Sequence, residues 1–426
     1  MSVHRCKGTR DMSPQEMRRF RLIEGIFRES CLQWGYEEVR TSTIEHLHLF
    51  TSTGTLTPSR LRRVYSFLDW DGWSGERVVL RPDVTIPIAR LYIETMADER
   101  LAKLFYVTDV FNFEETGKES REKWQCGAEL IGAGSATADV ELVTLALEVV
   151  RKLGLKDVEL RLSHAGIIRT LLTGFGLSHE KQTEVFDHIL DGDLSILAKL
   201  KPERPELGRT LATLLDLKGK SVGFLKNMRS LVNRDLPELE APFSNFIDIV
   251  ERLEAIGCGY QIDITSGRGF EYYTGLIFRL FIGSEEVGGG GRYDALIPLM
   301  GGRDTPASGF ALYLDCLMGL ISPEKLTQPS FGKILVSAGL KKAGDLKEAF
   351  DLVVRLHEAG YPAEVYLGGP EPADLKWIVE IRSKEPRYVL TDRVSQRKFE
   401  AGTGPEVVAL LGGRKPRPSA KSKGKR

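Results

Sequence analysis

The segment FNFEETGKESREKWQCGAELIG, residues 111–132, constrains the fold of this chain more than any other. Apolar and polar residues alternate on both sides of a charged loop, and this pattern predicts a hairpin of two strands. Gln125 and Glu129 then share one face of the second strand, and Asn112 and Glu114 share one face of the first. The opposite face carries Phe111, Phe113, Trp124 and Leu130. A polar face of this kind inside a hairpin indicates a small-molecule site.

Composition is that of an ordinary globular protein. The 426 residues, 42% hydrophobic and 28% charged, are enough for two or three domains with separate cores. No apolar run reaches 18 residues, and the first residues, MSVHRCKGTRDMSPQEMRR, lack the apolar region of a signal peptide. We therefore expect a cytoplasmic protein without a membrane span.

The sequence favours neither metal binding nor nucleic-acid binding. The five cysteines include no C-x-x-C pair, and His46 and His48 have no evident third ligand, so we expect neither a metal nor a disulfide. The last 13 residues, RKPRPSAKSKGKR, hold seven of the 59 Lys and Arg residues, which leaves 52 basic against 59 acidic residues elsewhere. We interpret residues 413–426 as a disordered solubilising tail rather than a polyanion contact.

The N-terminal half predicts alternating helices and strands. Ser13 and Glu16 fit a capping box around Pro14, so a helix is expected to begin there and to end near Gly35. Further strands are predicted at 36–45, 76–80 and 157–163, and further helices at 85–96 and 137–153. From about 166 to 250 the pattern is helical, which indicates a helical insertion.

Strand character then returns before a change of domain. Strands are predicted at 259–265 and 270–282, and GGGGRYD at 288–294 is interpreted as a flexible turn because it lacks the glycine order of a nucleotide fingerprint. A helix containing Phe310, Leu314, Leu317, Met318 and Ile321 closes a first domain, residues 1–322. After a linker at 323–330, a β-α-β-α-β pattern with a helix near 372–384 predicts a small, largely parallel α/β domain at 331–412.

Four segments concentrate polar residues among the predicted strands. They are LRPDVTIPIAR at 80–90, the hairpin, SGRGFEYYTG at 266–275 and GGGGRYD. Asp83, Gln125 and Glu129 suit an ammonium group, and Arg268 suits a carboxylate, so together they fit a free amino acid. Tyr272 and Tyr273 would alternate across a strand, so only one of them is expected to face the pocket. Taken singly, each of these residues is better explained as part of a strand-end ion pair.

The order of the motifs resembles the class II histidyl-tRNA synthetases over roughly residues 6–321. The matching segments are GTRD at 8–11, RPDVT at 81–85, the hairpin, RGFEYYTG at 268–275 and GGGRYD at 289–294. The resemblance implies an α+β fold, in which an antiparallel sheet is flanked by helices and carries a helical insertion. The C-terminal α/β block resembles the anticodon-binding domain of that family in pattern.

The resemblance also implies a histidine pocket. Carried over position by position, its residues are Asp83, Thr85, Gln125, Glu129, Arg268, Tyr272 and Tyr273. Asp83 stands where the synthetases have Glu, which is one methylene longer. We therefore expect its contact with the amine of the ligand to loosen or to run through water.

Two phosphate clamps of that family are replaced. Asn112 stands where an Arg holds the α-phosphate of ATP, and Cys316 where an Arg holds the γ-phosphate. Tyr313 and Ser42 also replace a motif Gly and a motif Pro. Asn brings no charge and Cys brings neither charge nor a fork of donors. Because one such contact is typically worth about 10² to 10³ in rate, the loss of both predicts no catalytic residues and little adenylate formation.

A synthetase-like core without ATP clamps resembles the regulatory subunits of ATP phosphoribosyltransferase, which are catalytically silent paralogues in histidine biosynthesis. RPDVTIPIAR and QCGAELIG resemble that family more than the true enzymes. The resemblance implies no cofactor, L-histidine as ligand, and a homodimer within a hetero-oligomer with the short-form catalytic subunit. Nucleic acid and membrane are not expected partners.

Two other interpretations stay open. The chain could be an active histidyl-tRNA synthetase, because it retains Arg268, a C-terminal domain and a basic tail, and Lys118 or Arg121 could replace a lost phosphate contact. It could also be a divergent paralogue that acts on another amino acid or carrier.

Overall fold

The computed structural model forms two compact units, Met1–Ser322 and Pro323–Arg426, which we describe separately. The structure describes residues 4–412 apart from 54–55, 57–60, 71–74, 115, 117–119, 179–180, 183–184, 186–210, 212–217, 233–235, 265–271, 323–331, 339–342 and 372–374. Much of the predicted helical insertion, the predicted linker and the basic tail therefore lie outside the described residues. Within the described part of the chain, no helix is long and apolar enough to cross a membrane.

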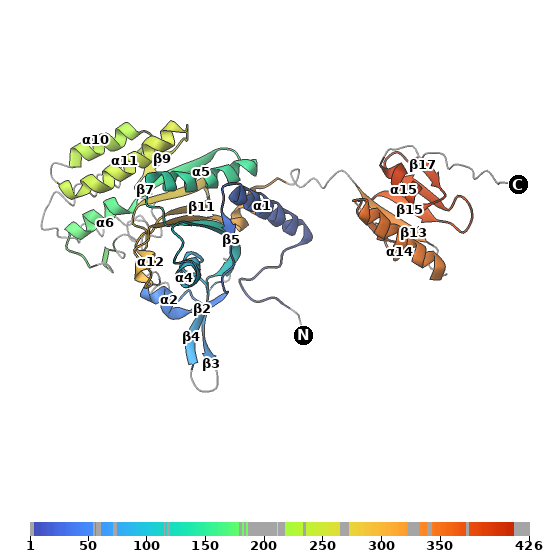
Figure 1. Ribbon diagram of the computed structural model, residues 1–426, viewed down its shortest axis with the longest axis horizontal. Helices are drawn as coiled ribbons and strands as arrows, with labels where there is room; N and C mark the ends of the chain where they lie inside the picture. Colours follow the sequence, from blue (N-terminus) through green and yellow to red (C-terminus); the bar gives the residue numbers. More distant parts are fainter. Residues whose placement is uncertain are drawn as a thin grey trace. The chain divides into compact units, whose positions relative to one another are not determined.

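The first unit contains the elements α1 to α13 and β1 to β12, several of which are labelled in Figure 1. Its helices are α1 (Pro14–Gln33), α2 (Leu47–Ser52), α4 (Thr85–Thr95), α5 (Ala136–Lys152), α6 (Ala165–Gly174), α10 (Val222–Val232), a 3₁₀ turn (Pro237–Leu239), α11 (Glu240–Ala255), α12 (Leu296–Leu299) and α13 (Leu314–Leu320). Its strands are β1 (Glu37–Glu38), β2 (Ile44–His46), β3 (Ser66–Trp70), β4 (Gly75–Leu80), β5 (Ala102–Phe111), β6 (Glu122–Ile131), β7 (Val158–His164), β8 (Lys218–Gly219), β9 (Gln261–Asp263), β10 (Leu276–Ile282), β11 (Glu285–Arg292) and β12 (Ala307–Tyr313).

Nine of these strands form one sheet, in the order β1-β5-β6-β12-β11-β10-β7-β9-β8. The central pairs, from β5 through β7, are all antiparallel. Figure 1 shows α1 and α5 on one face of this sheet and α4 and α12 on the other, and each face has its own cluster of buried apolar residues. The predicted α+β class, an antiparallel sheet flanked by helices, is confirmed.

Local sequence signals account for the first helix and the hairpin. Ser13 caps α1 through a reciprocal capping box with Glu16, as the sequence predicted. The two-stranded hairpin is also confirmed, because β5 and β6 pair antiparallel from Ala102 opposite Ile131 to Phe111 opposite Glu122. The prediction that Asn112 and Glu114 share a face of its first strand is wrong, because β5 ends at Phe111. The strand predicted at 36–45 is instead two short strands in different sheets, since β1 joins the large sheet and β2 pairs with β4.

The interpretation of GGGGRYD as a flexible turn is wrong. Gly288–Gly291 lie in β11, a central strand that pairs with β10 and β12. A Cβ on Gly290 would overlap the backbone of Gly309 on β12, so neighbouring strands leave no room for a side chain there. Likewise, Phe310 lies in β12 and not in the helix that follows, which begins at Leu314.

The second unit is a mixed α/β domain. Its elements are β13 (Lys333–Ala338), α14 (Ala343–Glu358), β14 (Ala363–Val365), β15 (Leu375–Ile381), β16 (Tyr388–Asp392), β17 (Lys398–Ala401) and α15 (Gly404–Leu411). The strand order is β14-β13-β15-β16-β17, in which β13 pairs parallel with both neighbours and the last two pairings are antiparallel. The helix predicted near 372–384 is wrong: Val379 and Ile381 alternate on the core face of strand β15.

Candidate functional site

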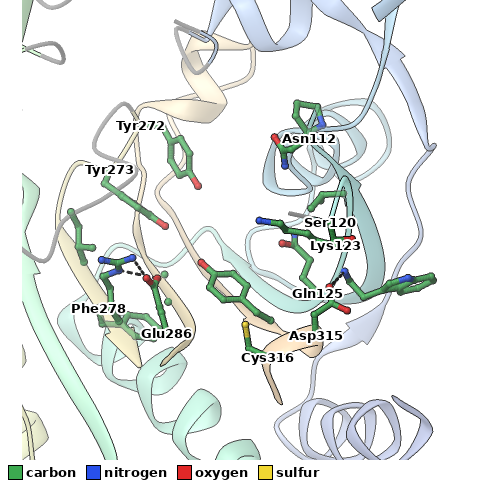
Figure 2. A pocket seen from close by; sticks show the side chains of 18 of the residues that line it. Asn112, Ser120, Lys123, Gln125, Tyr272, Tyr273, Phe278, Glu286, Asp315 and Cys316 are labelled. Carbon is green, nitrogen blue, oxygen red and sulfur yellow. Dashed lines mark hydrogen bonds and ion pairs between the residues drawn. The ribbon is translucent and has the colours of Figure 1, made fainter. Parts of the chain in front are cut away.

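A cavity of about 550 Å³ opens where β6, β11 and β12 meet the segment that precedes β10. Figure 2 shows Tyr272 and Tyr273 on one side of it, with Asn112 and Lys123 across from them. Asp315 and Cys316 line its base, where α13 begins. A cavity of this volume, with aromatic and charged groups in its wall, has the properties of a ligand site.

Glu129 is the most deeply buried acid on the polar face of β6, with 1% of its surface exposed. Its carboxylate accepts hydrogen bonds from Thr85 Oγ1 at 2.9 Å and from the hydroxyl of Tyr293. The pKa of Glu129 is raised to about 8, chiefly by burial and also by the nearby charge of Asp83, although both hydrogen bonds act to lower it. A cationic ligand group would therefore compensate a carboxylate that is otherwise poorly solvated.

Tyr293 is a site residue that the sequence analysis missed. It follows Arg292, the last residue of β11, and its backbone N–H donates to the carbonyl of Ala307 at 2.7 Å. Its neighbour Arg292 is anchored by a buried ion pair with Asp139 at 2.8 Å. The available signal was an aromatic residue with a polar tip just beyond the glycine run, but the interpretation of that run as a turn hid it.

Asp83 and Gln125 lie close to the same polar face. Asp83 Oδ1 accepts the N–H of Ile86 at 3.0 Å and so caps the start of α4. Burial raises the pKa of Tyr272, and the charges of Tyr273 and Asp83 raise it further. Gln125 lines the cavity, and its Nε2 donates to the hydroxyl of Tyr106 at 3.4 Å.

The expectation that only one of the two neighbouring tyrosines faces the pocket is wrong. Tyr272 and Tyr273 both line the cavity, with ring centroids 4.7 Å apart. Tyr272 also meets the ring of Tyr293 edge-on at 5.7 Å. Alternation applies only to extended backbone, and β10 begins at Leu276, beyond this pair.

Two of the predicted residues cannot be placed. Arg268 and Lys118 lie outside the described residues.

The two histidines near the start of α2 contact each other. His46 pairs with Glu76 at 2.8 Å, and its ring stacks on that of His48 with 5.2 Å between the ring centroids. Within the described ranges, no group of three His, Cys, Asp or Glu side chains could hold a metal ion.

Comparison with known proteins places this geometry in a family. The family model described as histidyl-tRNA synthetase matches residues 8–317. The ATP phosphoribosyltransferase regulatory subunit of Dehalococcoides mccartyi strain CBDB1 is 51% identical over 412 residues, which cover 96% of this chain and 99% of the relative. The chain belongs to the histidyl-tRNA synthetase-like family of ATP phosphoribosyltransferase regulatory subunits.

More distant members of the wider family share the same fold. The histidine–tRNA ligase of Methanosarcina acetivorans is 32% identical over 97% of this chain and 99% of its own. A crystal structure titled as an ATP phosphoribosyltransferase regulatory subunit/histidyl-tRNA synthetase from Bacillus halodurans aligns with a TM-score of 0.72 at 23% identity, covering 88% of this chain and 95% of its own. The crystal structure of the histidyl-tRNA synthetase from Nostoc sp. PCC 7120 aligns with a TM-score of 0.73 at 17% identity, covering 97% of this chain and 99% of its own. At these identities the two structures establish the fold alone.

Asn112 and Cys316, which the sequence analysis interpreted as replacements of two phosphate clamps, both line the cavity. Asn112 lies just beyond the end of β5, and its backbone N–H donates to the carbonyl of Arg121 at 2.9 Å. Cys316 lies in the first turn of α13, where burial raises the pKa of its thiol. A neutral amide and a neutral thiol thus occupy both positions.

The arginines that do line the cavity are each paired with a carboxylate. Arg10 pairs with Asp315, which also accepts the backbone N–H of Trp124 at 2.9 Å. Arg279 pairs through two nitrogens with Glu286. Figure 2 marks this second pair with dashed lines at Glu286. Their positive charge is therefore largely neutralised before any ligand arrives.

Arg121, one of the proposed substitutes for a lost clamp, is engaged within the hairpin loop. Its guanidinium donates to the carbonyl of Glu114 and stacks over the ring of Phe113, with 4.6 Å between the guanidinium carbon and the ring centroid. This arrangement ties the base of the loop together.

Proposed function

We propose that this chain is a catalytically silent regulatory subunit that binds L-histidine and assembles with the short catalytic subunit of ATP phosphoribosyltransferase. The names of its relatives at 50 to 51% identity support the regulatory role and the catalytic partner. The shape and charge of the cavity support the choice of ligand and the absence of catalysis.

One contrast within the cavity region carries the proposal. The acid that suits a cationic ligand is kept, because Glu129 is buried and hydrogen-bonded to Thr85 and Tyr293. The groups that would neutralise a triphosphate are replaced by Asn112 and Cys316. A zwitterionic amino acid fits this balance of charges, whereas ATP would bring several negative charges to a wall with little free positive charge.

The pocket residues take distinct parts in this proposal. Asp83, Gln125 and Glu129, with Thr85, receive the cationic part of histidine, and Tyr272 and Tyr273 enclose it. Arg268 is proposed to bind its carboxylate. In this arrangement Tyr293→Phe should weaken histidine binding about tenfold, because Glu129 loses a donor at its buried end. Tyr366→Phe in the second unit is the matched control.

An exchange assay on the full-length chain tests the absence of catalysis. The purified chain alone should show no histidine-dependent ATP–pyrophosphate exchange. Added to a short-form phosphoribosyltransferase, it should restore activity and confer inhibition by histidine. Robust exchange by the lone chain would overturn the proposal.

An active histidyl-tRNA synthetase is the second candidate function. It is favoured by relatives such as the Methanosarcina acetivorans histidine–tRNA ligase, which align along nearly the whole chain. Charging of tRNA(His) by the purified protein would decide for it. A calorimetric screen of the twenty amino acids tests the third possibility, a paralogue with a different ligand.

The second unit and the oligomeric state extend the proposal. We infer that residues 331–412 correspond to the anticodon-binding domain of the synthetases and that residues 1–322 are the synthetase-like core. The proposed assembly is a homodimer within a hetero-oligomer, which sedimentation analysis with and without the catalytic subunit would test.

A further inference from the structure

One threonine joins the two groups of tyrosines that surround the candidate site. Thr274 directly follows Tyr272 and Tyr273, in a segment that belongs to no helix or strand and precedes β10. Its backbone N–H donates to the carbonyl of Arg292 at 2.7 Å, one residue before Tyr293. The segment that carries the first two tyrosines is therefore bonded to the end of β11.

The hydroxyl of Thr274 forms hydrogen bonds on both sides of Tyr293. Its Oγ1 donates to the carbonyl of Arg292 at 3.3 Å and accepts the backbone N–H of Asp294 at 3.0 Å. These two residues stand immediately before and after Tyr293 in the sequence. A hydroxyl can donate and accept at once, whereas an apolar side chain of the same shape can do neither. The side chain of Thr274 thus holds its segment against the backbone that carries Tyr293.

The backbone that receives Thr274 is itself anchored at two places. The side chain of Arg292 is 5% exposed and pairs with Asp139 of α5 at 2.8 Å. Asp294 Oδ1 accepts the backbone N–H of Ala307, the first residue of β12, at 3.1 Å. Because α5 and β12 both hold this part of the chain, it provides a fixed support for the tyrosine segment.

The contacts of the rings depend on this support. The ring of Tyr272 meets that of Tyr293 edge-on at 5.7 Å between centroids, and the hydroxyl of Tyr293 donates to Glu129. A Cβ at Gly291 would come within 3.0 Å of the ring of Tyr273, so the glycine leaves room for this ring against β11. Figure 2 shows Tyr272 and Tyr273 together on one side of the cavity. The three rings form one wall beside the buried acid as long as the segment stays in place.

We propose that Thr274 is a positioning residue of the ligand pocket, whose hydroxyl holds Tyr272 and Tyr273 against Tyr293 and so fixes the wall beside Glu129. Thr274 lies outside the lining of the cavity and acts through the tyrosines. Its effect on affinity rests on the proposed function, in which an amino acid binds beside Glu129. Its effect on the order of the tyrosine rings does not.

Thr274→Val tests this role, because it removes the hydroxyl and keeps the branched shape. Calorimetry on the full-length chain should show histidine binding about tenfold weaker in this variant. Thr274→Ser, which keeps the hydroxyl, should bind histidine as the wild-type chain does. Thr144→Val on α5 is the matched control, because Thr144 Oγ1 donates to the carbonyl of Val140 at 2.7 Å and neither residue lines the cavity. It removes a comparable hydrogen bond and should leave histidine binding unchanged.

A second measurement needs no ligand. In the full-length chain labelled with meta-fluorotyrosine, the fluorine resonances of Tyr272 and Tyr293 are assigned through their Tyr→Phe variants. Both resonances should broaden in Thr274→Val, because the ring contact becomes intermittent, and should stay narrow in Thr274→Ser and Thr144→Val.

Unchanged line widths in Thr274→Val would overturn the positioning role. Unchanged histidine affinity in that variant, or an equal loss of affinity in Thr274→Val and Thr274→Ser, would overturn it as well. A wild-type chain that binds no histidine would instead overturn the proposed function, and the fluorine spectra would still decide whether Thr274 orders the tyrosines.

Discussion

Gly309 lies directly opposite Glu129 across the β12–β6 pairing, and a Cβ at Gly309 would overlap the Glu129 carboxylate. The glycine therefore leaves the space in which the buried acid turns to meet Thr85 and Tyr293. A position that carries no side chain thus decides where the charge of the candidate site lies.

Gly309→Ala should displace this carboxylate. We expect histidine affinity to fall at least about tenfold and the free energy of unfolding to fall by about 1 to 3 kcal/mol, because the added methyl overpacks a buried polar contact. Calorimetry with histidine and urea unfolding measure the two effects. Gly319→Ala on α13 is the control, since a Cβ there meets nothing within 4 Å. Unchanged binding by the first variant would remove Glu129 from the proposed site.

Glu129 should also make stability depend on pH. Its pKa is raised to about 8 in the folded chain, from 4.5, so the folded state holds a proton that the unfolded state has already released. The contribution of Glu129 to the free energy of unfolding is therefore most favourable below about pH 4.5 and is lost as the pH rises towards 8. The total change is as much as about 5 kcal/mol on the basis of 1.36 kcal/mol per pKa unit.

Glu129→Gln should remove most of this slope. Urea unfolding of the histidine-free chain at intervals between pH 5 and 9 provides the measurement, and Glu285→Gln at the exposed start of β11 serves as the control. The free energy of unfolding of the wild-type chain should fall between pH 5 and 9 relative to that of Glu129→Gln. If this difference stays constant or rises, the raised pKa of Glu129 is contradicted.

The buried ion pair that anchors the strand before Tyr293 should be essential to stability. Asp139→Ala leaves the guanidinium of Arg292 buried without its main partner, and we expect a loss of about 3 to 5 kcal/mol. Asp98→Ala breaks the exposed pair with Arg303, and should change stability by less than about 1 kcal/mol. Chemical unfolding of both variants gives the comparison, and equal losses would show that burial is not what matters.

Asp315 should stabilise the first unit more than its partner Arg10 does. Asp315→Ala removes the acceptor of the Trp124 N–H as well as the ion pair, whereas Arg10→Ala removes only the pair. We expect a loss of about 1 to 3 kcal/mol for the first and about 0 to 1 kcal/mol for the second. Unfolding curves of the two variants and of their combination separate the contributions. A larger effect of Arg10→Ala would contradict this account.

Local patterns predicted several elements correctly for reasons that the structure confirms. The capping box at Ser13 and Glu16 works within one turn, and the hairpin at 111–132 depends on neighbouring strands. The predictions that were wrong concern segments whose structure depends on contacts with distant parts of the chain. The glycines of β11 form a strand because other strands lie against both of its edges, a condition that no local propensity expresses. Residues 375–381 were mistaken for a helix for the same reason, since their place in a sheet comes from pairing with β13 and β16.

The sequence by itself determined the polar face of β6, because the period of a strand places Gln125 and Glu129 together wherever that strand lies. Only the tertiary structure decided that Tyr293 reaches Glu129 and that Asp315, 305 residues further along the chain, neutralises Arg10. These contacts join distant segments through the packing of a whole sheet, and spacing along the chain carries no information about them.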